Sequence, residues 1–238
     1  KAANNCRKGI IVFLTGDIGI RFFDILQLQT SRQHADFLAL PIIKSMNDGN
    51  LTKALYISFL TQWYHILKHT LPIILATQSR LTEETEWLTD VIGEFTEQMV
   101  SNEELILNDI AVCGGDIEQV RHSRAHMTTE LMVSYAYDTV NRINPLGILG
   151  MHHVLEGAVL SLAHRSADNI GTTSLVPKDA LTYLYTHGSL LQDNADVFIG
   201  VMNRIDRSED RNQIIRSAQI FYKLYADIFL SLSPELEK

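Results

Sequence analysis

The sequence contains few of the residues that crosslink or interrupt a chain. Among 238 residues there are only two cysteines, five prolines and thirteen glycines. Cys6 and Cys113 are too few and too far apart for a disulfide framework or a thiolate metal site, which suits a reducing compartment. We therefore predict a cytoplasmic protein in which Cys113 is a buried small hydrophobic residue rather than a nucleophile.

Long apolar runs and an excess of positive charge are also missing. No stretch reaches the roughly 20 apolar residues that a membrane span requires. The formal net charge is -8, with 20 Lys and Arg against 28 Asp and Glu, so phosphate backbones and anionic lipid surfaces would be repelled. These features argue against nucleic acid and membranes as partners.

Linkers and repeats are absent as well, and the hydrophobic content of 46% is enough for one sizeable core. A short apolar run, Gly9–Leu14, follows two basic residues and so resembles a signal peptide. The run is too short, Asp17 interrupts its continuation, and no small-residue cleavage site follows. We predict an N-terminal extension over residues 1–21 and a single helical domain over residues 22–238.

Apolar residues recur at three- and four-residue spacing from Phe22 onward, which is the periodicity of amphipathic helices. Together with the turn signals, this pattern predicts about seven long helices and no strand pair, and hence an all-α bundle. The predicted helices cover approximately residues 22–47, 51–78, 82–113, 117–143, 145–170, 177–205 and 208–232.

Local signals refine three of these helices. Pro72 is expected to kink the second helix, because proline lacks a backbone N–H. Pro177 is expected to be the first residue of the sixth helix. Ser208, followed by two acidic residues, is expected to cap the seventh.

The sixth predicted helix carries a lone histidine in an amphipathic pattern. His187, Leu191 and Asn194 stand at i, i+4 and i+7 and therefore share one face. Only His187 has a group that binds iron or zinc well, because leucine has no donor atom and a neutral amide is a poor ligand. The pattern indicates a site that has lost most of its metal chemistry.

The second predicted helix carries two histidines beside a tyrosine. His65 and His69 stand at i and i+4 next to Tyr64, a spacing that fits metal ligands and also two partners in a polar pocket. No carboxylate accompanies them on that helix, so we interpret them as pocket-lining or structural residues that hydrogen-bond to neighbouring helices. The basic segment 121–126, which holds two more histidines, is interpreted as a solvated face.

The fifth predicted helix places a carboxylate in an apolar run. His152 and His153 precede Glu156 by four and three residues. A carboxylate that faces inward needs a partner, which could be a metal ion or an imidazole such as His187. The second alternative requires no metal ion, because the imidazole belongs to the same chain.

Taken together, several motifs and their order are similar to those of the heme-oxygenase-like superfamily. The closest likeness is to its iron-containing redox branch, whose relatives include TenA-type thiaminases and pyrroloquinoline quinone synthase. The resemblance covers about residues 22–232. The motifs are Gln62–Pro72, Asn102–Asp109, Gly114-Gly115, Leu155–Gly157, Thr186–Gly188 and Phe198–Asn203.

The resemblance implies a metal site of which most ligands are replaced. Iron-binding members supply a Glu and a following His from one helix, a Glu from a later helix, and a His-x-x-x-Asp-x-x-His set from a third. Glu156 and His187 match this pattern. The remaining positions fall on Met99 or Phe95, Asn102, Leu191 and Asn194. Two ligands cannot hold a di-iron pair, so we expect no cofactor and, at most, one weakly held ion on Glu156 and His187.

The resemblance also implies a homodimer with a central pocket in each chain. The favoured interpretation is a protein that binds a small molecule there without catalysis. The alternatives are a metal-independent oxidase or other small-molecule enzyme that uses Glu156 and His187, and a thiaminase-like hydrolase, for which Cys113 is poorly placed at a helix end. The other expected pocket residues are Tyr64, His65, His69, Asn102, His153, Leu191 and Asn194.

Overall fold

The computed structural model describes residues 20–48, 50–99, 102–155 and 176–232, which fold into a single all-α domain. Residues 1–19 of the predicted extension lie outside these ranges. No strand occurs in the described residues. The α-helices are α2 (Phe22–Leu38), α3 (Pro41–Asn47), α4 (Lys53–Gln78), α5 (Leu88–Met99), α6 (Asn102–Val112), α7 (Ile117–His122), α8 (Met127–Asp138), α9 (Ile148–Val154), α11 (Thr182–Arg204) and α12 (Ser208–Ser231).

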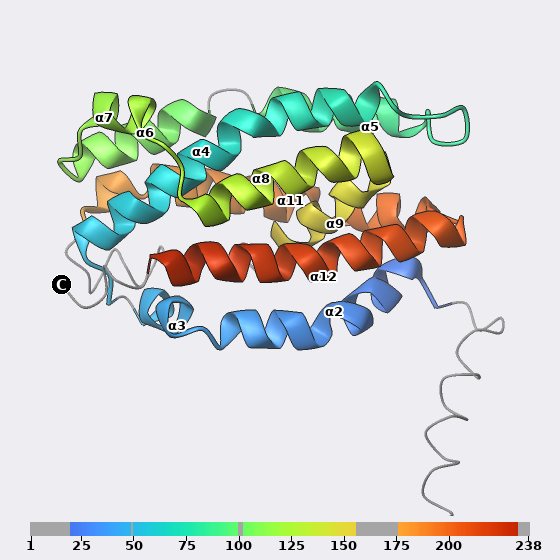
Figure 1. The fold of residues 1–238 in the computed structure, drawn as a ribbon, viewed down its shortest axis with the longest axis horizontal. Coiled ribbons are helices and arrows are strands. Elements are labelled where there is room, and N and C mark those ends of the chain that lie inside the picture. Colours follow the sequence, from blue (N-terminus) through green and yellow to red (C-terminus); the bar gives the residue numbers. More distant parts are fainter. Residues whose placement is uncertain (1–19, 49, 100–101, 156–175, 233–238) are drawn as a thin grey trace, which may run out of the picture.

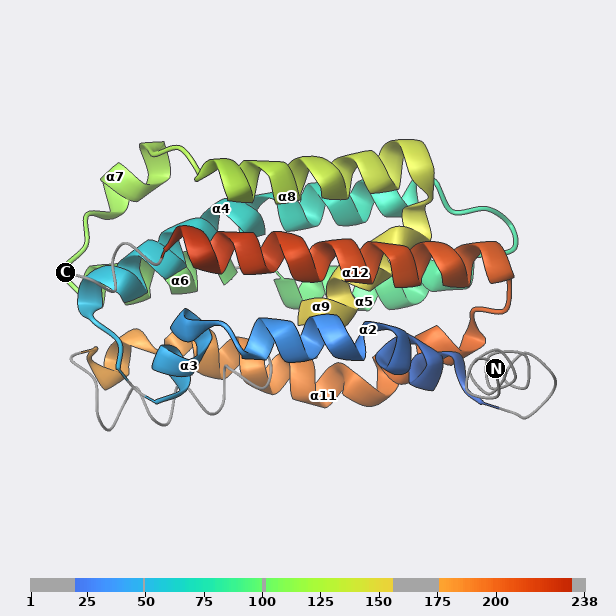
Figure 2. The same cartoon turned by 60° about the horizontal axis from the view of Figure 1, so that its bottom comes forward.

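Helix α12 forms the centre of the bundle. It packs against α2, α8 and α9, while α4 packs against α5, α6 and α8 (Figure 1). Helix α11 lies beside α2 and also contacts α6 (Figure 2). The apolar stripe predicted for the last helix is buried at every position, which confirms it. These residues are Ile214, Ala218, Phe221, Tyr225, Ile228 and Leu232.

A glycine allows α9 and α12 to approach closely. A Cβ on Gly150 would lie 2.6 Å from the backbone nitrogen of Ala218 and 2.6 Å from the carbonyl oxygen of Ile214. Both atoms belong to the backbone of α12 and cannot move aside as a flexible side chain could. Only glycine therefore fits at this crossing.

The structure has ten α-helices in its described residues, more than the seven predicted, because three predicted helices are divided. The third predicted helix corresponds to α5, which ends at Met99, and α6, which begins at Asn102. The first is divided before Pro41, since proline removes a backbone donor and restricts the preceding residue. The fourth is divided by residues 123–126, after which α8 begins. Helix α4, by contrast, continues through Pro72 to Gln78.

Three predicted helix starts also differ from the structure. The third predicted helix starts at Leu88 instead of near Thr82, because Thr82 and Thr85 hydrogen-bond to each other in a turn. Pro177 precedes a short 3-10 turn, and α11 begins only at Thr182. Ser208 is the first residue of α12, and no side chain of the preceding residue caps that helix.

Three helices without a side-chain cap of their own receive one from another helix. The Asn203 side chain on α11 accepts a hydrogen bond of 3.0 Å from the backbone N–H of Phe23 in α2. Asp109 on α6 does the same for the first turn of α11, and Gln62 on α4 accepts from the backbone N–H of the residue before α8. Because the first backbone N–H groups of a helix have no partner within it, these contacts fix where the helices begin.

None of the helices in the described ranges combines the length and apolar character needed to cross a membrane.

Candidate functional site

A cavity of about 120 Å³ lies inside the bundle, between α4, α5, α9, α11 and α12. Its wall is mostly hydrocarbon and aromatic. A cavity of roughly 150 Å³ with a similar apolar wall can hold benzene, so this one has room for a molecule of about one small ring. The apolar lining residues are Trp63, Ile66, Leu67, Ile73, Ile74, Leu88, Val91, Ile92, Leu146, Ile148, Leu149, Met151, Leu155, Phe198 and Val201.

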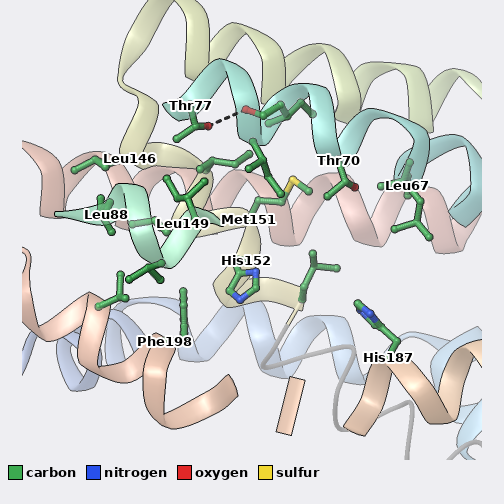
Figure 3. Close-up of a pocket in the computed structure, with 18 of the residues that line it drawn as sticks. Leu67, Thr70, Thr77, Leu88, Leu146, Leu149, Met151, His152, His187 and Phe198 are labelled. Carbon is green, nitrogen blue, oxygen red and sulfur yellow. Dashed lines mark hydrogen bonds between the residues drawn. The ribbon is translucent and has the colours of Figure 1, made fainter. Parts of the chain in front are cut away.

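A few polar side chains interrupt the apolar wall. Figure 3 shows the imidazoles of His152 on α9 and His187 on α11, with Thr70 and Thr77 of α4 on another side of the cavity. The Thr77 hydroxyl donates to the carbonyl oxygen of Ile73 at 2.9 Å, so its donor is used within the helix. Two tyrosines complete the polar lining, Tyr183 on α11 and Tyr225 on α12.

Three polar atoms of this wall have no hydrogen-bond partner among the described residues. They are Nδ1 of His187 and the hydroxyl oxygens of Tyr183 and Tyr225. His187 is 5% exposed, and the two tyrosines are 1% and 0% exposed. A buried polar group without a partner costs about 1–3 kcal/mol, so a bound molecule that supplied partners would recover part of this free energy.

The aromatic rings of the wall pack in three pairs. The rings of Tyr183 and His187 are stacked, with centroids 5.2 Å apart and an angle of 14° between their planes. His152 packs on Phe198 with a centroid distance of 4.7 Å. Trp63 packs on Tyr225 at 5.8 Å, and a hydrogen-bonding contact from its indole lowers the pKa of Tyr183, against the larger effect of burial, which raises it. An indole N–H can only donate, so the Tyr183 O–H still has no acceptor among the described residues.

Burial keeps the side chains of His187, Tyr183 and Tyr225 neutral at neutral pH. It lowers the pKa of His187 to about 4, with a smaller contribution from His152. It raises the pKa values of Tyr183 and Tyr225 far above the usual range for a phenol. The described lining contains no Lys, Arg, Asp or Glu. The cavity therefore presents neutral hydrogen-bonding groups on an apolar surface.

The other histidines predicted for the pocket do not line this cavity. His65 and His69 lie on α4 but hydrogen-bond towards α7 and α8, at 2.9 Å to the Ser123 hydroxyl and 3.1 Å to the Tyr137 hydroxyl. Tyr64 packs against the His65 ring and is likewise outside the lining. His65 and His69 therefore make the contacts to neighbouring helices that were one of their two predicted roles, whereas Tyr64 was predicted only for the pocket.

His153 faces away from the cavity as well. Its Nε2 lies 3.1 Å from the Thr30 hydroxyl on α2, and burial lowers its pKa to about 4. Asn194 is half-buried and does not line the cavity. Glu156 and the side chains of Asn102 and Leu191 lie outside the described residues.

The basic segment 121–126 is only partly a solvated face. Its arginines and His122 are exposed, but His126 is half-buried. Nδ1 of His126 hydrogen-bonds to the Ser231 hydroxyl at 3.1 Å, because this loop packs against the end of α12.

Sequence reasoning found His187 but missed the other polar groups of the cavity. His152 was considered only as a neighbour of Glu156, and Tyr225 only as a member of an apolar stripe. Tyr183 precedes His187 by four residues, which puts both on one helix face. That spacing is the signal from which Tyr183 could have been predicted.

The described residues do not fit the di-iron centre that the resemblance implies. They contain no group of three or more His, Cys, Asp or Glu side chains able to hold a metal ion. Iron pairs in helical bundles are held mainly by carboxylates, whereas the described lining offers His152 and His187 among hydrocarbon.

Cys113 is not part of the cavity lining either. It is 7% exposed and follows the last residue of α6, where Gly114 has a φ of 87° and ends the helix. Burial raises the pKa of its thiol. A protonated, buried thiol is a weak nucleophile, which agrees with a packing role.

The fold is shared with several solved structures. A domain of unknown function with a heme oxygenase-like fold from Shewanella denitrificans superposes with a TM-score of 0.80 at 21% identity, over 92% of this chain and 94% of that chain. A TenA homologue from P. horikoshii has a TM-score of 0.73 at 10% identity, over 90% and 98%. Heme oxygenase-1 from the cyanobacterium Synechocystis, in complex with heme, has a TM-score of 0.65 at 11% identity, over 91% and 94%.

The curated proteins contain no significant match to the chain. A family model does match, over residues 57–226, and its description is iron-containing redox enzyme. These residues extend from α4 into α12 and include every residue of the described cavity lining. The chain has the heme oxygenase-like fold and belongs to the family of iron-containing redox enzymes.

Proposed function

We propose that the protein binds a small organic molecule in the cavity between α4, α5, α9, α11 and α12. The observation that carries this proposal is the imidazole of His187, which lines the cavity while its buried Nδ1 has no partner among the described residues. A pocket with apolar walls and a few polar groups is the usual form of a small-molecule site. The apolar wall would supply the affinity and His187 the orientation.

We further propose that the chain has lost the di-iron centre of its family. Support comes from the two imidazoles and the hydrocarbon of the described lining, and from the amide and leucine at three of the implied ligand positions. Elemental analysis of the purified protein after dialysis against a chelator tests this. Retention of about two iron atoms per chain, as in di-iron bundles, would overturn it.

The binding proposal is tested with a panel of one-ring fragments, followed by ligand-detected NMR and thermal shift. Fragments should bind the wild type, and His187→Leu should weaken those that carry a polar group. His122→Leu is the matched control, because it removes an exposed imidazole on α7. The proposal fails if no fragment binds the wild type, or if the two substitutions have equal effects on binding.

A second candidate is a metal-independent oxidase or another small-molecule enzyme that uses His187 together with Glu156. The observation in its favour is that the buried imidazole is neutral at neutral pH and can therefore accept a proton. Turnover of a bound compound by the wild type, and its loss in His187→Ala with binding retained, would favour this candidate. Binding without turnover in both proteins would favour the non-catalytic role.

The assembly proposed for the chain is a homodimer, as the family resemblance implies, and its proposed location is the cytoplasm, which suits its two cysteines. Exposed apolar side chains on α4, namely Leu71 and Leu75, supply surface that a second copy could cover. Light scattering coupled to size-exclusion chromatography tests the dimer. A monomer at micromolar concentration would contradict it.

A further inference from the structure

We infer that the ligand of this cavity is a neutral one-ring molecule with a carbonyl oxygen, which accepts hydrogen bonds from the hydroxyls of Tyr183 and Tyr225. This inference rests on the proposed small-molecule site and specifies its ligand. It is carried by two tyrosines that line the cavity with unpartnered buried hydroxyls, and by the absence of Lys, Arg, Asp and Glu from the described lining.

The charge of the ligand follows from the wall. No Lys or Arg in the described lining could pair with a carboxylate or phosphate, and no Asp or Glu could pair with an ammonium group. An unpaired charge in such a medium costs far more than a single hydrogen bond returns. A neutral molecule can enter this cavity without that cost.

The hydrogen-bonding character follows from the unpartnered atoms. Each phenol has one O–H to donate, and burial keeps both phenols protonated. Tyr183 and Tyr225 are also close enough to influence each other electrostatically. A carbonyl oxygen has two lone pairs and can accept from both hydroxyls, whereas a hydrocarbon would leave both donors unsatisfied.

The size of the ligand follows from the cavity volume of about 120 Å³ and from its aromatic walls. This volume is close to that of apolar cavities that hold a single benzene ring. The stacked rings of Tyr183 and His187 and the ring of Phe198 line the same cavity. A ring that lies against these faces keeps its apolar surface away from water.

The test uses four probes that share a six-membered ring. Cyclohexanone carries the carbonyl, and methylenecyclohexane replaces its oxygen by a carbon of the same shape. Cyclohexanecarboxylate and cyclohexylammonium carry a negative and a positive charge. NMR titration of the full chain should show cyclohexanone bound about 5- to 30-fold more tightly than methylenecyclohexane, as expected for one or two added hydrogen bonds.

Three conservative Tyr→Phe variants test which hydroxyls donate a hydrogen bond to the carbonyl oxygen of the ligand. Tyr183→Phe and Tyr225→Phe should each weaken cyclohexanone binding about 5-fold or more and change methylenecyclohexane binding less than about 2-fold. Tyr135→Phe is the matched control, because its hydroxyl is also buried without a partner in the described residues but lies outside the cavity lining. It should leave the binding of all four probes unchanged.

The possible results separate this inference from the proposed function. Tighter binding of a charged probe, or equal binding of the ketone and its hydrocarbon analogue, would overturn the ligand class and leave the small-molecule site intact. Equal losses in the three Tyr→Phe variants would overturn the role of the two hydroxyls. If none of the four probes binds, both the inference and the proposed site are wrong.

Discussion

The backbone N–H of Tyr183 donates a hydrogen bond of 2.8 Å to the Asp109 carboxylate, which ties the first turn of α11 to α6. The N–H of Thr182 donates to the same carboxylate at 3.2 Å, and so does the Thr182 hydroxyl. Asp109 is 1% exposed and serves as the N-terminal cap that α11 lacks in its own sequence. It thereby holds Tyr183, and one turn later His187, at the wall of the cavity.

Removal of this carboxylate should destabilise the fold strongly. Asp109→Ala leaves two backbone N–H groups without their acceptor, and we expect a loss of about 2–4 kcal/mol in the free energy of unfolding. Asp109→Asn should cost less, because the amide oxygen still accepts and burial already raises the pKa of the carboxyl. Urea denaturation measures both.

The control for Asp109 is a cap on an exposed helix end. Asp116 accepts from the N–H groups of Glu118 and Gln119 at the start of α7. Asp116→Ala should cost about 1 kcal/mol, as is usual for an exposed cap. Equal losses in Asp109→Ala and Asp116→Ala would contradict the role assigned to Asp109.

Gln62 should be a second buried polar residue that stabilises the bundle. Its side-chain oxygen accepts from the backbone N–H of His126 at 2.8 Å and from the Thr129 hydroxyl at 2.9 Å. Gln62→Leu removes this acceptor and should cost about 2–4 kcal/mol in urea denaturation. Gln219→Leu, which removes an exposed bond to a carbonyl oxygen, should change stability by less than about 0.5 kcal/mol. Similar losses in the free energy of unfolding for the two variants would show that the buried hydrogen bonds of Gln62 contribute no more to stability than an exposed one.

The contact between α9 and α12 should not tolerate a methyl group. Gly150→Ala pushes a Cβ against backbone atoms of α12, and we expect a loss of at least about 1–3 kcal/mol in thermal or urea unfolding. Gly200 lies in α11, and a Cβ at this position would meet no atom of a neighbouring described element within 4 Å. Gly200→Ala should therefore stabilise the protein by about 0.5–1 kcal/mol. If Gly150→Ala were as stable as the wild type, α9 and α12 would have to lie farther apart than the structure shows.

Acid should unfold the protein well above pH 4. Burial lowers the pKa values of His65, His153 and His187 to about 4 in the folded state. The unfolded value is about 6.5, so the unfolded chain binds more protons between pH 6.5 and 4, and stability falls as the pH falls through this range. His153 and His187 each contribute at most about 3 kcal/mol, and His65 contributes no more than that. Together they approach the whole stability of a typical domain.

Circular dichroism melts between pH 7.5 and 4.5 measure this pH dependence. The melting temperature should fall steeply below pH 6.5, and His153→Gln should reduce the slope because it removes one of the three groups. A melting temperature that stays constant from pH 7 to 5 would show that these imidazoles are not held neutral in the folded state.

The sequence determined the fold class and the face of the central helix. The stripe from Ile214 to Leu232 could be predicted because helix periodicity is local: each apolar residue lies within four positions of the next. The same holds for the end of α6 at Gly114, since a glycine with positive φ ends a helix by bonds to the preceding turn. His187 was also found in this way, as a polar residue on an apolar face.

The tertiary structure decided what surrounds those residues. Asp109 and Tyr183 are 74 positions apart, and Phe23 and Asn203 are 180 apart, so no local pattern predicts their hydrogen bonds. The direction in which His65 points depends on where α7 packs, because it bonds to Ser123 at the end of that helix. Tyr225 becomes a cavity residue because α4, α5, α9 and α11 enclose a space beside α12. Local periodicity states which face of a helix is buried, whereas the partner of a buried polar group depends on contacts between helices that the chain makes only when it folds.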